Sequence, residues 1–197
     1  MTLLLILAVI GVVVAMAVVI SKNNQKQREA AELVDAQADA RRWIERLGSQ
    51  VLSLNGTDEP STRALSDASE RYTAASAQMS EARSAKQARL ARESALEGLH
   101  YVNAARERMG LPAGPTLPAL EGQREAGAVS EDRSVEVDGQ TITASPSASD
   151  ETPHYYPGGR VAGRPVPAGW YSAPWWAPAA ASGAVSYTHL RAHETRH

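Results

Sequence analysis

The residues whose type and spacing could do chemistry most directly lie at the end of the chain. Three of the five histidines stand there, at His189, His193 and His197. A spacing of four residues places side chains on the same face of a helix. Neutral imidazole is a good ligand for zinc or copper. Taken alone, this triad would suggest a transition-metal site.

The surrounding sequence argues against that interpretation. Residues 185–195 read Val-Ser-Tyr-Thr-His-Leu-Arg-Ala-His-Glu-Thr. This segment resembles one translated frame of a transposase adaptor used to prepare sequencing libraries. The match covers eleven consecutive residues, which argues against coincidence. We therefore interpret residues 185–197 as adaptor sequence, expect the natural C-terminus to be missing, and predict no metal ligands.

Upstream of this segment the chain offers no catalytic constellation. It has no phosphate loop, dinucleotide fingerprint, paired-histidine zinc motif or nucleophile elbow. His100 is a lone histidine expected to pack or to lie at the surface, and Arg41, Arg42 and Arg46 alternate with Glu45 as a solvated charged face. We predict no catalytic residue, no cofactor and no enzymatic activity.

Composition narrows the partners further. The formal net charge of −2 argues against a nucleic-acid-binding surface. The absence of Cys excludes disulfides and thiolate metal sites. Four aromatic residues remain as a candidate binding surface for a peptide or glycan, or as the core of a small module: Tyr155, Tyr156, Trp170 and Tyr171.

The first element that must position these residues is apolar. Residues 2–20 carry no charge and would span about 28 Å as a helix, close to the thickness of a bilayer core. Cleavage after Ala17 as a signal peptide is the competing reading, but no basic residue precedes the run. Lys22, Lys26 and Arg28 follow it, so the positive-inside rule predicts an outside N-terminus and a cytoplasmic body in the cell membrane.

The next region, residues 24–110, has helical periodicity. We expect a first helix that ends at left-handed Asn55-Gly56. A second helix should be capped by Asp58 or Ser61, and a third should begin near Ser84. The second helix carries a heptad-like stripe typical of a coiled-coil seam, formed by Leu65, Ala68, Tyr72, Ala75, Met79 and Ala82. A mainly α membrane protein with a helical hairpin or a three-helix coiled-coil-like bundle is the expected fold class, although one helix continuous from the second to the third is also compatible with the pattern.

Beyond the helices, residues 111–130 read as a Pro-, Gly- and Ala-rich linker. Residues 131–172 predict a small β-hairpin and aromatic module, with a turn at Asp138-Gly139 that sets Val135 opposite Ile142. Residues 173–184 contain Trp175 and Trp176 before an Ala-rich run. They suggest the start of a truncated second transmembrane helix, with a Pro-rich binding segment as the alternative.

Four segments carry a family resemblance: residues 40–48, 95–102, 152–159 and 163–172. The last two contain Tyr-Tyr-Pro-Gly-Gly and Gly-Arg-Pro-Val-Pro-Ala-Gly-Trp-Tyr-Ser. The chain resembles an uncharacterised actinobacterial membrane-protein family with an N-terminal anchor, a helical region, an aromatic module and a second apolar segment. The resemblance implies this architecture and transfers no activity.

Two functions are therefore expected. The first is a membrane-anchored, non-enzymatic scaffold or adaptor, held in the lipid bilayer, whose helices associate with themselves or with a protein partner. The alternative is a membrane-tethered or secreted binding module that uses its aromatic segment to bind a peptide or glycan.

Overall fold

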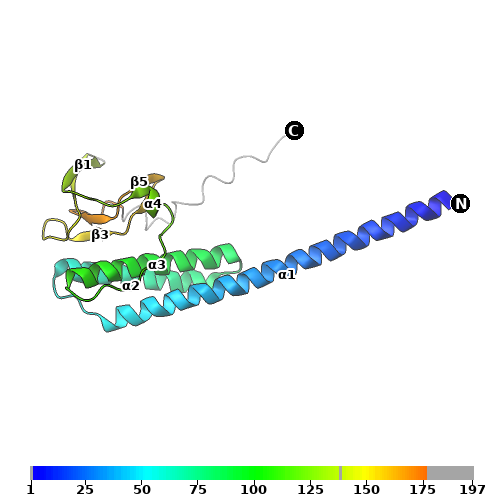
Figure 1. Ribbon diagram of the computed structural model, residues 1–197, viewed down its shortest axis with the longest axis horizontal. Coiled ribbons are helices and arrows are strands. Elements are labelled where there is room, and N and C mark those ends of the chain that lie inside the picture. Colours follow the sequence, from blue (N-terminus) through cyan, green and yellow to red (C-terminus); the bar gives the residue numbers. More distant parts are fainter. Residues whose placement is uncertain (1, 138, 177–197) are drawn as a thin grey trace.

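The computed structural model of the chain describes residues 2–137 and 139–176, with side chains from residue 16 onward. Three long helices come first and a small sheet module follows, lying on one side of the helices (Figure 1). In chain order the elements are α1 (Thr2–Ser53), α2 (Glu59–Glu81), α3 (Ala85–Arg108), α4 (Gln123–Ala126), β1 (Arg133–Val137), β2 (Gln140–Ser145), β3 (His154–Tyr156), β4 (Gly159–Val161), β5 (Arg164–Val166) and β6 (Gly169–Tyr171).

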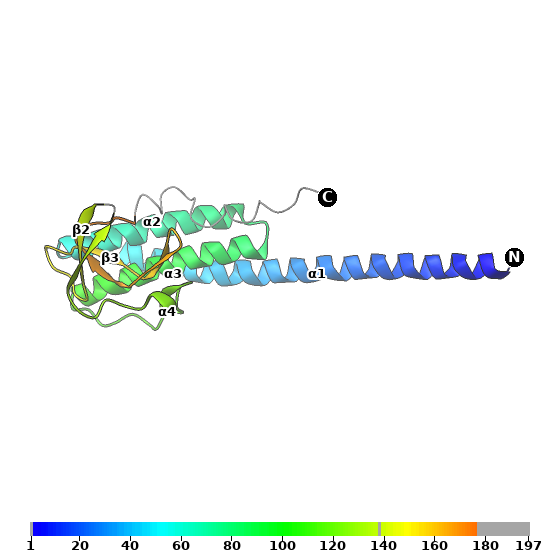
Figure 2. The ribbon, with the colours of Figure 1, turned by 90° about the horizontal axis from the view of Figure 1, so that it is seen from above.

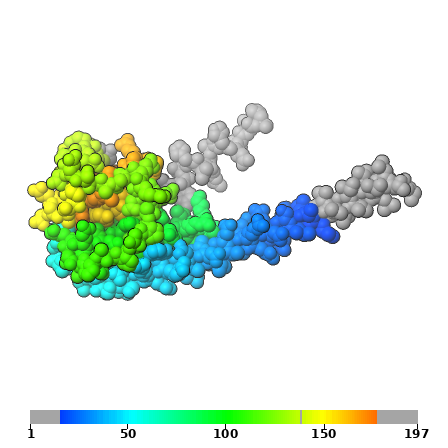
Figure 3. All heavy atoms as spheres, in the orientation of Figure 1, coloured from blue at the N-terminus to red at the C-terminus, as the bar shows by residue number. Residues whose placement is uncertain are grey.

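α1 is far longer than its two neighbours. It runs for 52 residues, and its N-terminal part projects beyond α2 and α3 (Figure 2). All described side chains from 16 to 32 are exposed, and Leu33 is the first that is half-buried. The Gln37 side-chain amide donates a 3.3 Å hydrogen bond to the carbonyl of Ala82, just beyond the end of α2. The bundle therefore begins near Gln37, and the space-filling view shows the earlier part of the helix protruding from the body (Figure 3).

The structure corrects the membrane prediction. Within the part of the chain that it describes, no helix combines the length and the apolar composition that crossing a bilayer requires. α1 does not end near residue 20 but continues to Ser53, with exposed charged side chains from Lys22 onward. This finding contradicts the predicted transmembrane helix over residues 2–20, the membrane-protein class, and the cell-membrane localisation with a cytoplasmic body.

Capping fixes where α2 begins. The Asp58 carboxylate accepts a 2.9 Å hydrogen bond from the backbone N–H of Ser61, whose hydroxyl in turn accepts from the N–H of Asp58. This capping box satisfies donors that the helix leaves unpaired, and Pro60 fits in the first turn because its missing N–H is not needed there. The preceding helix ends before Asn55 and Gly56, but neither has the positive φ that the sequence predicted.

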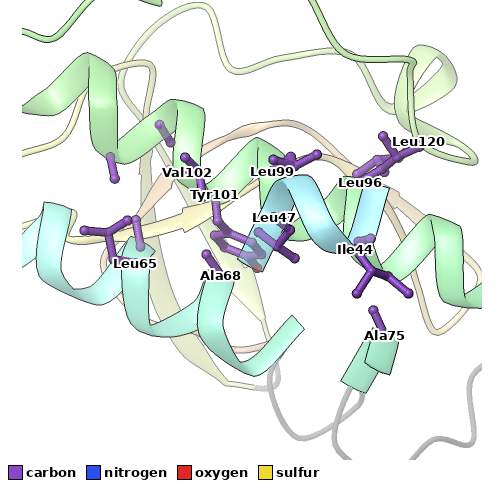
Figure 4. Packing of buried hydrophobic residues seen from close by; sticks show 14 of the residues in the cluster. Ile44, Leu47, Leu65, Ala68, Ala75, Leu96, Leu99, Tyr101, Val102 and Leu120 are labelled. Atoms are coloured by element: carbon purple, nitrogen blue, oxygen red, sulfur yellow. The ribbon is translucent and has the colours of Figure 1, made fainter. Parts of the chain in front are cut away.

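The heptad-like stripe of α2 packs against the chain's own helices. Its residues Leu65, Ala68 and Ala75 are buried in the core shared by the three helices (Figure 4), and Ala82, just beyond the end of α2, is also buried. Gly98 of α3 faces this seam: a Cβ there would lie 2.5 Å from Cδ2 of Leu47 and 3.0 Å from Cβ of Arg71. Small residues thus let three helices approach closely. α3 is a separate helix capped by Ser84, so α2 and α3 are not continuous.

The sheet is larger than the predicted hairpin. Its four antiparallel strands lie in the order β1-β2-β6-β3, and β4 pairs separately with β5. Val135 pairs with Ile142 as predicted, while Asp138 of the turn lies outside the described residues. The aromatic stretches do not merely support this hairpin. They form its continuation, because β6 pairs with both β2 and β3.

A second hydrophobic core closes the sheet module. It includes Val129, Ile142, Tyr156, Tyr171 and Trp176, the last only 6% exposed. Trp176 is therefore a core residue of this module. The rest of the predicted second apolar segment, 177–184, and the adaptor-like segment 185–197 lie outside the described residues.

Candidate functional site

The densest cluster of ionisable groups lies where the sheet meets the bundle. Arg71 of α2 donates a 3.4 Å hydrogen bond from Nη1 to Oε2 of Glu97 on α3, and each of these side chains is 27% exposed. Asp67 lies one helical turn before Arg71. Tyr101 lies one turn after Glu97 and is only 4% exposed. Two carboxyls, a guanidinium and a phenol thus share a half-buried junction.

Burial governs the protonation of this cluster. Loss of solvation, reinforced by the charge of Glu70, raises the pKa of Asp67 from 3.8 to about 6, although Arg71 acts in the opposite direction. Burial also raises the pKa of Glu97, against the pull of Arg71, and raises the pKa of Tyr101 well above its ordinary value. Carboxyls with pKa values near neutrality occur at catalytic sites and in structural networks alike.

The surroundings favour a structural network here. Beside the carboxyls, the ring of Tyr101 packs edge-on against Tyr155 of β3, with ring centroids 5.8 Å apart. Tyr155 in turn packs against Trp170 of β6 at 5.1 Å. Tyr101 lies among the bundle core residues seen in Figure 4. These ring contacts, beside the ionisable cluster, dock the sheet on the bundle.

The four aromatic residues proposed to line a groove are brought together, but on two faces of the sheet. Side chains alternate along a strand, so Tyr155 and Trp170 point to one face of the sheet, and the next residues, Tyr156 and Tyr171, point to the other. Trp170 contacts the bundle core, whereas Tyr156 and Tyr171 belong to the second core, both around Trp176. Exposed fractions of 8%, 6% and 2% for Tyr156, Trp170 and Tyr171 show that these three fill cores. Of the four residues, Tyr155 alone is half-buried.

Among the described residues the histidines form no metal-binding site. No group of three or more His, Asp or Glu side chains there could hold a metal ion. The ring Nε2 of His100 lies 3.3 Å from the carbonyl of Pro118, and burial lowers the pKa of this histidine despite that hydrogen bond. His189, His193 and His197 lie outside the described residues.

Comparisons with protein-family models, with curated proteins and with solved structures give no match. The resemblance to an actinobacterial membrane-protein family therefore gains no support from them. Function has to be argued from the geometry of this chain.

The sequence missed one surface feature. The arginines of α1 were expected to form a solvated face, and Arg42 does so in a pair with Asp39 at 2.9 Å. Arg46 instead lines a hollow between α1, α3 and the loop after α3, together with Arg106. Only the fold of that loop brings the two together, so periodicity alone could not have shown the hollow.

Proposed function

We propose that the chain is a non-enzymatic scaffold that pairs with a second copy of itself. Its bundle and sheet form the body, and the projecting part of α1, residues 16–35, forms a stalk. The two stalks would lie side by side and antiparallel. Support comes from the exposure of the stalk: apart from half-buried Leu33, every side chain in it is exposed to solvent.

One observation carries the proposal, namely the segregation of charge along this stalk. The cations Lys22, Lys26 and Arg28 all precede the acids Glu29, Glu32 and Asp35. None of the six forms an ion pair with another described residue. The stalk therefore presents a basic half followed by an acidic half.

Such a helix is complementary to itself only in one direction. In an antiparallel pair the basic half of one stalk would lie alongside the acidic half of the other, with Lys22 level with Asp35, Arg28 level with Glu29 and Lys26 close to the level of Glu32. A parallel pair would place like charges opposite each other, which is unfavourable.

The body supports a scaffolding role in a second way. The rings of Tyr101, Tyr155 and Trp170 pack together at the junction of bundle and sheet, where they fix one to the other. Because α1 continues without a break from the stalk into the bundle, the position of the stalk is transmitted rigidly to the sheet. Two paired copies would hold two sheet modules at opposite ends.

Charge reversal tests this proposal on the full chain. One variant carries Lys22→Glu, Lys26→Glu and Arg28→Glu, and the other carries Glu29→Lys, Glu32→Lys and Asp35→Lys. Sedimentation equilibrium should show a dimer for the unmodified chain and weaker self-association for each variant. An equimolar mixture of the two variants should recover a dimer, because each acidic stalk then faces a basic one. A control with Arg124→Glu and Arg164→Glu, both exposed on the sheet side, should dimerise normally.

Cysteine pairing tests the direction. The chain has no cysteine, so Lys22→Cys and Asp35→Cys can be introduced separately. Mixed under mild oxidation, they should form the 22–35 disulfide in preference to either like pair. A monomeric chain at all concentrations, or reversal variants that dimerise as well as the unmodified chain, would refute the proposal.

A further inference from the structure

A hollow of about 190 Å³ lies between the bundle and the loop that follows α3. This volume is below the roughly 300–1,000 Å³ of sites for drug-sized ligands, so its occupant must be small. Side chains of α1 and α3 form the floor, and the loop forms the rim. The floor includes Arg46 of α1 with Leu99, Val102 and Arg106 of α3, and the rim includes Gly114 and Leu117.

The charge of this lining is one-sided. Its two ionisable residues, Arg46 and Arg106, are both cationic, and no acidic side chain of the described residues lines the hollow. Six other described arginines, at positions 42, 63, 71, 92, 108 and 160, each pair with a carboxylate. Arg46 and Arg106 form no ion pair within the described chain, although both are half-buried.

The contacts that these two side chains do make are neutral ones. Arg106 donates from Nε to the carbonyl of Pro112 at 3.0 Å and from Nη1 to Oε1 of Gln50 at 3.3 Å. The guanidinium of Arg46 lies 5.6 Å from the ring centroid of Trp43. These contacts hold the guanidinium groups in place but leave both charges uncompensated. A half-buried cation of this kind is stabilised by an anion that forms charge-assisted hydrogen bonds.

The rim is built closely onto α3. A Cβ at Gly114 would lie 2.1 Å from Oδ1 of Asn103, so only glycine lets the loop approach the helix this closely. Leu117 packs against the bundle core on the same side. With Leu99 and Val102 it supplies apolar wall beside the two guanidinium groups.

We propose that this hollow binds a carboxylate that carries a short apolar group. The guanidinium groups of Arg46 and Arg106 bind the carboxylate, and the apolar group lies against Leu117, Leu99 and Val102. A free organic acid and the C-terminal residue of a peptide share this chemistry. The site is independent of stalk pairing, because neither arginine belongs to the stalk.

Isothermal titration calorimetry on the full chain tests the site. N-acetyl-leucine is the probe, and N-acetyl-leucinamide, of similar shape without the charge, is its control. Saturable binding is expected for the acid and none for the amide. Arg46→Gln and Arg106→Gln should each weaken binding about tenfold or more, since each removes a charge-assisted hydrogen bond. Arg41→Gln, an equal charge change at an exposed position of the same helix, should leave binding unchanged.

A peptide that ends in leucine identifies the source of the carboxylate. Tighter binding of the free-acid peptide than of N-acetyl-leucine points to a protein C-terminus, and equal binding points to a free organic acid. Thermal melts of each variant establish that it is folded. If a glutamine variant fails to fold, Gly114→Ala disturbs the rim alone and should also weaken binding. Absence of saturable binding up to about 10 mM probe, or equal binding by all folded variants, would overturn the proposal.

Discussion

The helical bundle and the sheet module are held together by different kinds of side chain. Alanine is the commonest residue of the bundle core, where it makes up seven of the sixteen buried residues. The core of the sheet module contains one alanine among eight, beside tyrosine, tryptophan and branched aliphatic residues. The bundle is therefore stabilised by many close backbone approaches, and the sheet by a few large side chains.

This difference determines where each region is sensitive to mutation. Removing one methyl group from an alanine-rich seam loses little apolar area, whereas adding one meets backbone or Cβ atoms at once. For the rings that the sheet module contributes to either core the reverse holds, because truncating one of them removes a large apolar area. The bundle should tolerate loss of volume, and the sheet should not.

The largest effect is expected at Trp170. It is 6% exposed on β6, which lies between β2 and β3, and its ring packs on Tyr155 and the bundle core. Trp170→Ala should lower the free energy of unfolding by about 3–5 kcal/mol. Hydrogen exchange measured by mass spectrometry should show loss of protection in the sheet strands while α2 and α3 remain protected.

Val135→Ala serves as the matched control within the same sheet. Val135 is 38% exposed on the edge strand β1, so its truncation should change stability by less than about 1 kcal/mol. Equal loss of protection in the bundle and the sheet of Trp170→Ala would show that both regions unfold as one unit, and the comparison would fail.

The same contrast explains how much of the fold could be predicted. The helices were predictable because their signals are local: the 3.6-residue period, the Asp58 cap and the Ser84 cap. The hairpin was predictable from Asp138-Gly139 for the same reason. The pairing of β6 with β2 and β3 depends on segments far apart in sequence, and three-residue strands carry too few alternating positions to indicate register.

The candidate site follows this pattern too. The sequence indicates that Tyr155, Tyr156, Trp170 and Tyr171 belong together, but the face on which each lies depends on a strand register that the sequence does not predict. Arg46 and Arg106 are far apart in sequence, because α2 and most of α3 lie between them. The loop that closes the hollow was predicted to be a linker. Gly114 was the available local signal, since a glycine in a loop can mark a close approach to a neighbouring element. At residues 2–20 the prediction of a transmembrane helix was wrong, because it rested on a single hydrophobic run.

The next effect tests the bundle. Gly98→Ala replaces a residue of low helix propensity with the best helix former, which alone would stabilise an exposed helix by up to about 1 kcal/mol. Here the new Cβ would meet Leu47 and Arg71, so we expect a net loss of about 1–3 kcal/mol in urea unfolding. Combining it with Leu47→Val should show coupling in a double-mutant cycle. A net gain from Gly98→Ala would mean that the helices are not closely packed there.

The smallest effect is a gain in stability at the junction between the two regions. Burial raises the pKa of Asp67 from 3.8 to about 6, so the folded chain binds a proton more tightly than the unfolded chain between these values. The contribution of Asp67 to the free energy of unfolding therefore falls as pH rises from about 4 to about 6 and stays low above that range. Asp67→Asn keeps the shape and removes the charge. The variant should be more stable by about 1–2 kcal/mol at pH 8, after discounting for partial exposure, and nearly unchanged at pH 3.5.

Chemical unfolding at pH 8 and pH 3.5 measures both stabilities. Asp132→Asn is an exposed control that should leave the free energy of unfolding unchanged at either pH. The charged groups that face Asp67 are Glu70, Arg71, Glu97 and Arg63, of which only the two arginines favour its ionised form. If Asp67→Asn were destabilising at pH 8, the attraction to Arg71 would outweigh the cost of burial. The junction would then be held by ion pairing, as at a surface salt bridge, and the docking of the sheet on the bundle should weaken with salt. A stabilising result instead leaves the aromatic contacts of Tyr101, Tyr155 and Trp170 as the main attachment, because a buried carboxylate that opposes folding cannot be what holds the two regions together.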